Sequence, residues 1–261
     1  MSKRNLSDYQ YFKIDVTDGI ACIAFNRVEK HNVVTLDTFK ELNEFLMRVG
    51  EDEGIDVVIL TGNGEKAFCA GVDIESFEIQ NAGQALEWAI QCQSVFSSIE
   101  RLPKPVIAAV NGFAFGFGVE IAMVCDITLA SEKAIFGMLE IKHGLLPAVL
   151  LTRGREILDK KTISYLAMTG DHFSAQEAKE YGLINKVVTH ISLIDEAYAV
   201  ARRIQGNSPL GVSMVKRLLN RQGEKHSDDV VSFLPTLFLT NDFGEARRAF
   251  AEKRSPNFKA N

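Results

Sequence analysis

One stretch, KPVIAAVNGFAFGFGVE at residues 104–120, constrains the fold more than any other part of the sequence. Its segment PVIAAV is a continuous apolar run with Pro105 at the first position, where a strand tolerates a missing N–H. Gly112, Gly116 and Gly118 follow within a few residues, and the apolar segment VEIAMV comes next. This order predicts a buried strand, a glycine-rich turn and the start of a helix.

The turn before that helix exposes unpaired backbone N–H groups at the positive end of the helix dipole. Such groups stabilise a phosphate, or an oxyanion that develops during a reaction. A dinucleotide-binding GxGxxG motif fails on spacing, because counting from Gly116 and Gly118 puts Ile121 where the third glycine belongs. The stretch also has no GK[ST] of a phosphate-binding P-loop. Taken alone, the glycines favour a packing turn.

Strand and helix patterns alternate along the chain. Apolar or alternating runs predict strands at 12–16, 20–25, 57–61, 105–110, 126–130 and 183–189. Apolar residues at helical spacing predict helices over about 36–49 and 86–99, the second marked by Leu86, Ile90, Val95, Phe96 and Ile99. From about residue 191 the pattern is helical and is broken at Pro209 and Pro235. Alternation of this kind favours an α/β fold with a helical C-terminal part.

Two glutamates lie close to glycine-rich turns. Glu120 falls in the first turn of the helix after residue 118, among apolar neighbours, where the environment would shift its pKa. Glu140 lies twenty residues further on, in the segment FGMLEIKHGLLP. In isolation, a glutamate in the first turn of a helix or in a loop is more often a solvated side chain than a catalyst.

A second glycine turn, AFCAGVDI at residues 67–74, follows the apolar strand VVILT. It offers a further exposed N–H, that of Val72, at what we expect to be the same end of the sheet. Alone, this turn is typical of a tight connection in which Asp73 caps a helix. Two glycine turns after two buried strands, with glutamates downstream, favour an enzyme active site without defining its reaction.

The composition bears on the possible partners. Of the 261 residues, 46% are hydrophobic and 24% are charged, which is an ordinary balance for a globular protein. The formal net charge of −5 leaves no basic surface for nucleic acid or an anionic membrane. A cluster of basic residues near the C-terminus is more typical of a solvated helix face, and comprises Arg247, Arg248, Lys253 and Arg254.

The four cysteines are widely spaced without a CxxC pair, and the five histidines form no HExxH or similar spacing. We therefore expect reduced thiols and no metal site. The N-terminal MSKRNLSDYQ has no apolar signal-peptide core, and no apolar run reaches the length of a membrane span. These features predict a cytoplasmic protein with neither a nucleic-acid nor a membrane partner.

Five segments match the motifs of one known family. AFCAGVDI resembles AF(S/C/A)AGADI, and KPVIAAVNGFAFGFGVEIAMVCDITLAS resembles KPVIAAVNGxAxGGGxELAxxCDxxxAx. FGMLEIKHGLLP resembles FGxPExxxGxxP, MTGDHFSAQEAKEYGLINKVV resembles TGxxxxAxEAxxxGLVxxVV, and FAEKRSPNFK resembles FxEKRxPxF. The family is the enoyl-CoA hydratase (crotonase) superfamily, and the resemblance covers essentially the whole chain from about residue 11.

This resemblance implies an α/β fold built as a spiral of ββα units. Residues 1–195 would form the core with the acyl-CoA site, and residues 196–261 a helical region for assembly into a homotrimer or a dimer of trimers. The implied substrate is an acyl-coenzyme A thioester, and no separate cofactor is implied because coenzyme A is part of the substrate.

The resemblance also implies roles for individual residues. Glu120 and Glu140 match the two catalytic glutamates, and the backbone N–H groups of Val72 and Phe117 match the oxyanion hole. The positions that match contacts to coenzyme A or the acyl group are Lys30, Ala70, Asp73, Ile74, Ala148, Phe250 and Lys253. Among them, Lys30 matches a contact to the coenzyme A phosphates, and the last two match a helix that often reaches a neighbouring subunit.

Two departures from the family pattern concern the site. The usual GGG before the first glutamate is Gly116-Phe117-Gly118, so we expect a phenyl ring beside the site. The usual PGAGG after the second glutamate is PAVLL at 147–151, which changes the loop and the pocket. A set of aromatic residues hints at an unusual acyl group, although such residues are more often part of a core: Phe77, Trp88, Phe113 and Phe115.

Water addition to an α,β-unsaturated thioester needs a base, an acid and an enolate stabiliser, and the matched residues supply all three. Hydration is therefore the first hypothesis. There are two enzymatic alternatives. One is a double-bond isomerase that works with Glu140 alone, and the other is a hydratase-lyase that acts on a hydroxycinnamoyl thioester. A catalytically inactive or RNA-binding relative is the non-enzymatic alternative, which the acidic balance and the retained glutamate pair disfavour.

Overall fold

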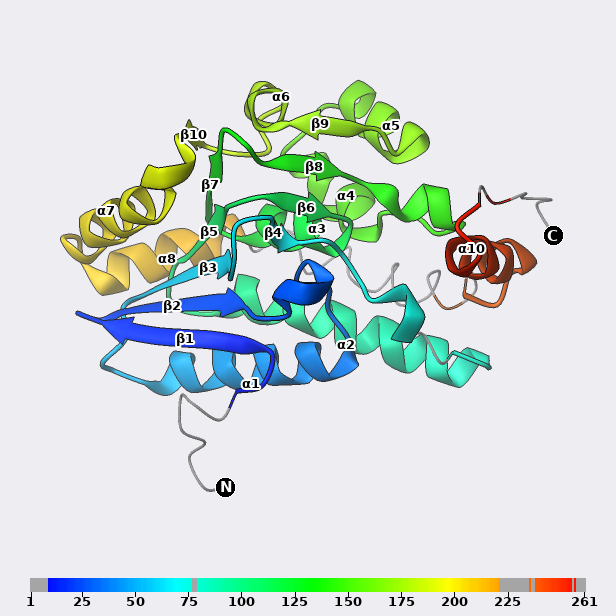
Figure 1. Ribbon diagram of the computed structural model, residues 1–261. Coiled ribbons are helices and arrows are strands. Elements are labelled where there is room, and N and C mark those ends of the chain that lie inside the picture. The colour runs from blue at the N-terminus through cyan, green and yellow to red at the C-terminus, as the bar shows by residue number, and fades with distance from the viewer. Residues whose placement is uncertain (1–8, 77–78, 221–234, 236–237, 255, 257–261) are drawn as a thin grey trace.

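The computed structural model of the protein describes residues 9–76, 79–220, 235, 238–254 and 256 (Figure 1). Outside these ranges lie Phe77, most of the N-terminal segment MSKRNLSDYQ, and the last residues of the closing motif FAEKRSPNFK. Within them the chain forms two β-sheets with helices packed around them.

The larger sheet has six strands in the order β1-β2-β3-β5-β7-β10. Their bounds are β1 Phe12–Thr17, β2 Ile20–Phe25, β3 Val57–Gly62, β5 Val106–Val110, β7 Ile127–Ser131 and β10 Lys186–Val188. Only the β1–β2 pair is antiparallel, and the other neighbours are parallel. The interior strands β3 and β5 are buried at every residue, which explains their continuous apolar sequences. All six strands were predicted, with small differences in their ends.

The second sheet has four strands of three residues each, in the order β4-β6-β8-β9. Their bounds are β4 Ala67–Cys69, β6 Phe113–Phe115, β8 Ile135–Gly137 and β9 His172–Ser174. The sequence interpretation assigned no strand here, because three residues are too few to show a period-2 pattern. Successive strands β3 and β4, β5 and β6, and β7 and β8 divide between the two sheets, and a helix follows each pair. This repeat is the expected spiral of ββα units.

The α-helices are α1 Leu36–Glu51, α2 Ala82–Arg101, α3 Phe117–Val124, α4 Ala148–Thr152, α5 Lys160–Thr169, α6 Ala175–Glu180, α7 Leu193–Gln205, α8 Pro209–Leu219 and α10 Asn241–Ala251. Short 3₁₀ helices are η2 Val28–Lys30, η3 Ile74–Ser76, η4 Leu139–His143, η5 Arg153–Glu156 and η6 His190–Ser192. In Figure 1, α1 and α2 lie below the sheets, and α7 and α10 lie at opposite sides. None of the helices in the described part of the chain is long and apolar enough to cross a membrane.

Helix α2 buries only part of the apolar pattern that predicted it. Val95, Phe96 and Ile99 are buried, whereas Leu86 and Ile90 are exposed. The buried face also carries Trp88, Cys92 and Gln93. Apolar residues occur on more than one side of this helix, so spacing alone did not identify the face that packs.

The C-terminal helices do not form one separate layer. α7 buries Leu193, Ala197 and Ala201 against the six-stranded sheet, in a core cluster that also includes Val57 and Ile107. The predicted boundary at residue 195 falls inside this helix. Helix α10 packs against η4 and η3, next to the second glycine turn. The division into a core and an assembly region stays a prediction.

Candidate active site

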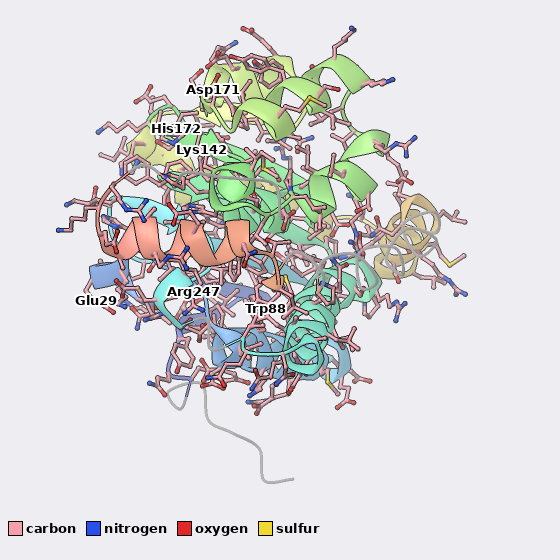
Figure 2. All side chains as sticks on the ribbon, turned by 90° about the vertical axis from the view of Figure 1, so that its right-hand side faces the viewer. Glu29, Trp88, Lys142, Asp171, His172 and Arg247 are labelled. Atoms are coloured by element: carbon pink, nitrogen blue, oxygen red, sulfur yellow. The ribbon has the colours of Figure 1, made fainter. Side chains whose placement is uncertain are left out.

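A cavity of about 110 Å³ lies among α2, α3, η4 and the two glycine turns. Seven of the predicted site residues line it, and these are Ala70, Val72, Ile74, Phe117, Glu120, Glu140 and Ala148. The other predicted residues, Lys30, Asp73, Phe250 and Lys253, do not line it. In Figure 2, α10 crosses this face of the molecule between Lys142 of η4 and Trp88 of α2.

The Val72 N–H points toward the cavity because its neighbours are bonded on the opposite side. Val34 N donates to Gly71 O at 2.9 Å, and Asp73 N donates to Val34 O at 2.8 Å. In an extended segment, N–H and C=O groups of successive residues point to alternate sides. The Val72 N–H is therefore turned away from Val34, and among the described residues it donates to no backbone oxygen.

The Phe117 N–H likewise donates to no backbone oxygen among the residues that the structure describes. Phe117 is the first residue of α3, so its N–H has no partner within the helix. The preceding Gly116 has φ +49°, and a Cβ there would lie 2.9 Å from Glu140 Oε1. Gly118 is packed so tightly that a Cβ would lie 2.0 Å from Cys69 O. The glycines on either side of Phe117 thus let α3 approach β4 and let Glu140 approach the turn.

The phenyl ring of Phe117 was expected beside the site, and the structure places it at the edge of the core. It packs between Phe39 and Phe96, with ring centroids 4.9 and 5.2 Å away. Phe117 is 3% exposed, although it also contributes to the cavity wall. Replacement of the usual glycine by phenylalanine therefore fills the space behind the oxyanion turn and keeps its N–H.

Glu120 lies one helical turn into α3, and its carboxylate is held by the first turn of α4, the short helix that follows Pro147. Val149 N donates to Glu120 Oε1 at 2.8 Å. Burial raises the Glu120 pKa from 4.5 to about 7, while the Val149 N–H, the Arg153 guanidinium and the Leu150 N–H act in the opposite direction. A carboxyl group with a pKa near neutrality is suited to general base catalysis.

Glu140 lies in η4 and faces the same cavity. The residue is half-buried, but its carboxyl oxygen Oε2 is shielded from solvent and, among the described residues, has no hydrogen-bond partner. Burial raises the Glu140 pKa well above 4.5, and the negative charge of Glu120 raises it further. Two carboxyl groups that share a cavity in this way influence each other's titration. The geometry favours the higher pKa at Glu140, because its Oε2 is unpaired among the described residues whereas Glu120 Oε1 accepts from the Val149 N–H.

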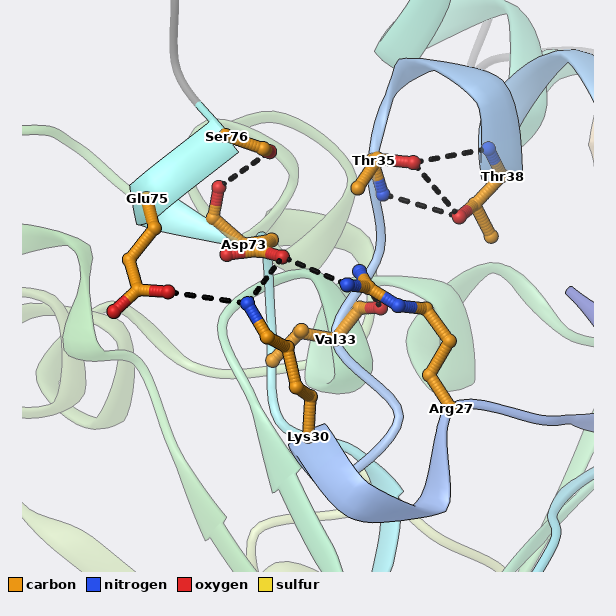
Figure 3. Close-up of polar contacts among 8 residues, drawn as sticks. All are labelled: Arg27, Lys30, Val33, Thr35, Thr38, Asp73, Glu75 and Ser76. Carbon is orange, nitrogen blue, oxygen red and sulfur yellow. Dashed lines mark hydrogen bonds and ion pairs between the residues drawn. The ribbon is translucent and has the colours of Figure 1, made fainter.

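Lys30 and Asp73 belong to a polar network at the edge of the second glycine turn (Figure 3). Asp73 Oδ2 lies 3.0 Å from Arg27 Nη2 and 3.4 Å from Lys30 Nζ. Lys30 Nζ also lies 3.1 Å from Glu75 Oε2. Asp73 is 7% exposed. It therefore ties the Val72 segment to the segment that ends in η2, whereas the half-exposed Lys30 ammonium remains within reach of solvent.

Phe250 and Lys253 lie at the end of α10, on the outer side of the site. The Phe250 ring is 49% exposed and lies edge-on to the His143 ring, with centroids 6.2 Å apart. His143 lines the cavity, and burial lowers its pKa. Lys253 is exposed, with φ +53°. In this chain α10 thus lies next to the cavity of its own subunit.

Apart from Trp88, sequence reasoning missed the cavity wall that α2 and the chain at α10 contribute. This wall, called the acyl side below because it is the apolar one, consists of Trp88, Cys92, Gln93, Phe96, Phe238 and Phe243. The Trp88 and Phe238 rings are 5.0 Å apart, as are those of Phe238 and Phe243. Of the suspected aromatic residues that the structure describes, Trp88 and Phe115 line the cavity and Phe113 does not. Positions 88, 92 and 96 repeat every four residues, which is the pattern that could have identified this face.

Comparison with known proteins agrees with this geometry. The family model described as enoyl-CoA hydratase/isomerase matches residues 15–261. The short-chain-enoyl-CoA hydratase of Clostridium acetobutylicum is 38% identical over 240 residues, which cover 90% of this chain and 92% of that protein. The crotonyl-CoA hydratase of Syntrophomonas wolfei is 35% identical over 255 residues, covering 96% of this chain and 98% of that protein.

Among solved structures, an enoyl-CoA hydratase from Mycobacterium avium subsp. paratuberculosis superimposes with a TM-score of 0.86 at 25% identity. The match covers 96% of this chain and 99% of that one. The sequence motifs, the repeat of ββα units and these full-length matches point to the same conclusion. The protein belongs to the enoyl-CoA hydratase/isomerase family.

Proposed function

We propose that the protein is a hydro-lyase that adds water reversibly across the 2,3-double bond of an enoyl-CoA thioester. The observation that carries this proposal is the pair Glu120 and Glu140 in one cavity with the Val72 and Phe117 N–H groups, which donate to no backbone oxygen in the described part of the chain. The curated relatives named as hydratases, at 35–38% identity over most of the chain, support the same reaction. Coenzyme A enters as part of the substrate, and the reaction needs no other cofactor.

The residues divide the reaction between them. The thioester carbonyl oxygen accepts hydrogen bonds from the N–H groups of Val72 and Phe117, which stabilise the enolate that forms as water attacks Cβ. Glu120 takes a proton from the attacking water, and Glu140 gives its proton to Cα. After the product leaves, the proton on Glu120 returns to Glu140 through water in the shared cavity. This exchange restores the starting protonation state.

An isomerase that uses Glu140 alone is the nearest alternative. The Val149 N–H bond to Glu120 Oε1 favours the hydratase, because it orients a second carboxylate that a one-base isomerase does not need. Glu120→Gln and Glu140→Gln should each lower kcat for crotonyl-CoA hydration by about 10²-fold or more. The exposed Glu132→Gln variant should keep full activity and serves as the control. Near-normal hydration by Glu120→Gln would reject the two-glutamate mechanism.

We also propose that Lys30 contacts the coenzyme A phosphates and that α10 covers the coenzyme A side through Phe250 and Lys253. The raised pKa of Lys30, caused mainly by its bond to Glu75, keeps its ammonium charged. Binding of a phosphate by Lys30 requires release of that bond. The Phe250 ring is positioned beside cavity-lining His143 and is still half-exposed.

The exposed face of α8 supports assembly into a trimer or a dimer of trimers. Five apolar residues of this short helix are exposed, and these are Leu210, Met214, Val215, Leu218 and Leu219. A contiguous apolar patch of this kind is typical of a protein interface. Met214→Glu combined with Leu218→Glu should shift the protein to monomers in analytical ultracentrifugation. An unchanged mass would remove α8 from the interface. A cytoplasmic location stays a prediction.

A further inference from the structure

One amide lies among the apolar residues of the acyl side of the cavity. Helix α2 contributes Trp88, Cys92, Gln93 and Phe96 to the wall, and all four are buried. Gln93 is 6% exposed, and the other residues that α2 contributes to this wall are two aromatic side chains and a thiol. A buried amide in such surroundings is costly unless its donors and acceptor are paired.

The oxygen of this amide is fixed by an ion pair behind it. Arg153 Nη1 donates to Gln93 Oε1 at 3.0 Å. Arg153 also donates from Nε and Nη2 to the two carboxylate oxygens of Glu100, at 2.5 and 2.8 Å. A guanidinium has donors but no acceptor, so it can face only the oxygen of the amide. The contact therefore fixes the orientation of Gln93 and directs its NH₂ group away from Arg153.

The NH₂ group of Gln93 is available to a ligand. Within the described residues, Nε2 makes no hydrogen bond to a protein group, while the side chain lines the cavity. The site therefore holds a donor whose position is set by Arg153 and Glu100 and whose acceptor is missing.

The position of this donor relates it to one part of an acyl group. The thioester oxygen is assigned to the N–H groups of Val72 and Phe117, and Cα and Cβ to the glutamates. By elimination, the Gln93 amide is expected to interact with atoms of the acyl chain beyond Cβ. An anionic group is disfavoured there, because Glu120 carries negative charge in the same cavity and Glu100 already balances the charge of Arg153.

We propose that Gln93 selects enoyl-CoA substrates whose acyl chain carries a neutral acceptor oxygen, such as an ether or hydroxyl, beyond Cβ. This inference rests on the proposed function of the site. An oxygen at that position accepts a hydrogen bond from the Gln93 NH₂ group, whereas a methylene leaves this donor without an acceptor. A site built around such a donor discriminates between two chains of equal size by the missing hydrogen bond.

Two isosteric pairs of probes test the inference. 4-Methoxycrotonyl-CoA and 2-hexenoyl-CoA differ by an oxygen in place of a methylene, and their kcat/KM values for hydration are compared. Binding of the saturated analogues, 4-methoxybutanoyl-CoA and hexanoyl-CoA, is measured by calorimetry and requires no turnover. Gln93→Met keeps the side-chain length and removes the donor. Gln91→Met is the matched control, since Gln91 lies on the same helix but does not line the cavity.

The wild type and Gln91→Met should prefer the ether over the hydrocarbon by about 10-fold in both measurements, and Gln93→Met should abolish or reverse that preference. A purely structural role, or a role in holding the attacking water, would lower activity on both probes equally. An unchanged ratio in Gln93→Met, or no preference in the wild type, would overturn the inference. A Gln93-dependent preference in binding without any hydration would instead support the inference and refute the proposed function.

Discussion

The ion pair between Arg153 and Glu100 should set the pH at which Glu120 becomes active. The guanidinium lowers the Glu120 pKa, which burial has raised to about 7. Arg153→Met removes that charge, and the loss of a nearby opposite charge raises a carboxyl pKa by roughly 1 unit or more. The acid limb of kcat/KM should therefore move from near pH 7 to about pH 8. At neutral pH the ionised fraction falls from roughly one half to roughly one tenth, which predicts an activity loss of about fivefold that disappears at higher pH.

A second substitution in the same pair should shift the limb in the opposite direction. Glu100→Gln leaves the Arg153 charge without its carboxylate, so the charge acts more strongly on Glu120 and the acid limb should move below pH 7. The assay is kcat/KM for crotonyl-CoA between about pH 5.5 and about pH 9.5. Thermal melting of each variant verifies that it is folded over this range, because breaking a buried ion pair is destabilising. Limbs that do not move, or that move in the same direction in both variants, would refute the reasoning.

Three further perturbations have defined outcomes. Because folding raises the pKa of Glu120 from 4.5 to about 7, its ionisation removes about 3 kcal/mol of folding stability as pH rises through 7. In urea unfolding, Glu120→Gln should therefore be more stable than wild type at about pH 8, and this advantage should disappear near pH 4. Gly118→Ala should fail to fold, since its Cβ would lie 2.0 Å from Cys69 O, whereas Gly50→Ala, with 3.6 Å to the nearest side chain, should match or exceed wild-type stability by about 0.5–1 kcal/mol in thermal melting. Lys30→Gln should raise KM several-fold with kcat unchanged, and the difference should shrink at high salt; a salt-independent KM would exclude a phosphate contact.

The sequence anticipated the parts of the molecule that local pattern determines. Long apolar runs such as that of β3 identify buried parallel strands. The family motifs then grouped Val72, Phe117, Glu120 and Glu140, and in the structure all four line one cavity, while their roles stay a prediction. Which of the two glutamates has the higher pKa did not follow from sequence. That depends on the Val149 N–H and on Arg153, which are placed by α4 and η5 after Pro147.

The remaining features arise from tertiary packing. The three-residue strands of the second sheet exist because their neighbours pair with them, which no local pattern reports. The ring of Phe117 turns toward Phe39 and Phe96 because the core has room for it there. The sequence analysis did not single out Gln93, because a polar residue within a helix pattern carries no local signal of its own. Its role emerges only when Arg153, sixty residues away in sequence, is seen to hold its oxygen.

The order of synthesis gives the wall at α10 a consequence for incomplete chains. Both glutamates and both oxyanion donors are translated within the first 140 residues, whereas Phe238 and Phe243 of the cavity wall follow about one hundred residues later. A chain that ends before residue 238 therefore carries the reactive groups, together with Val149 and Arg153, but lacks two aromatic side chains of the cavity wall. We expect this wall to be completed only after α10 has been synthesised and has packed against η4 and η3.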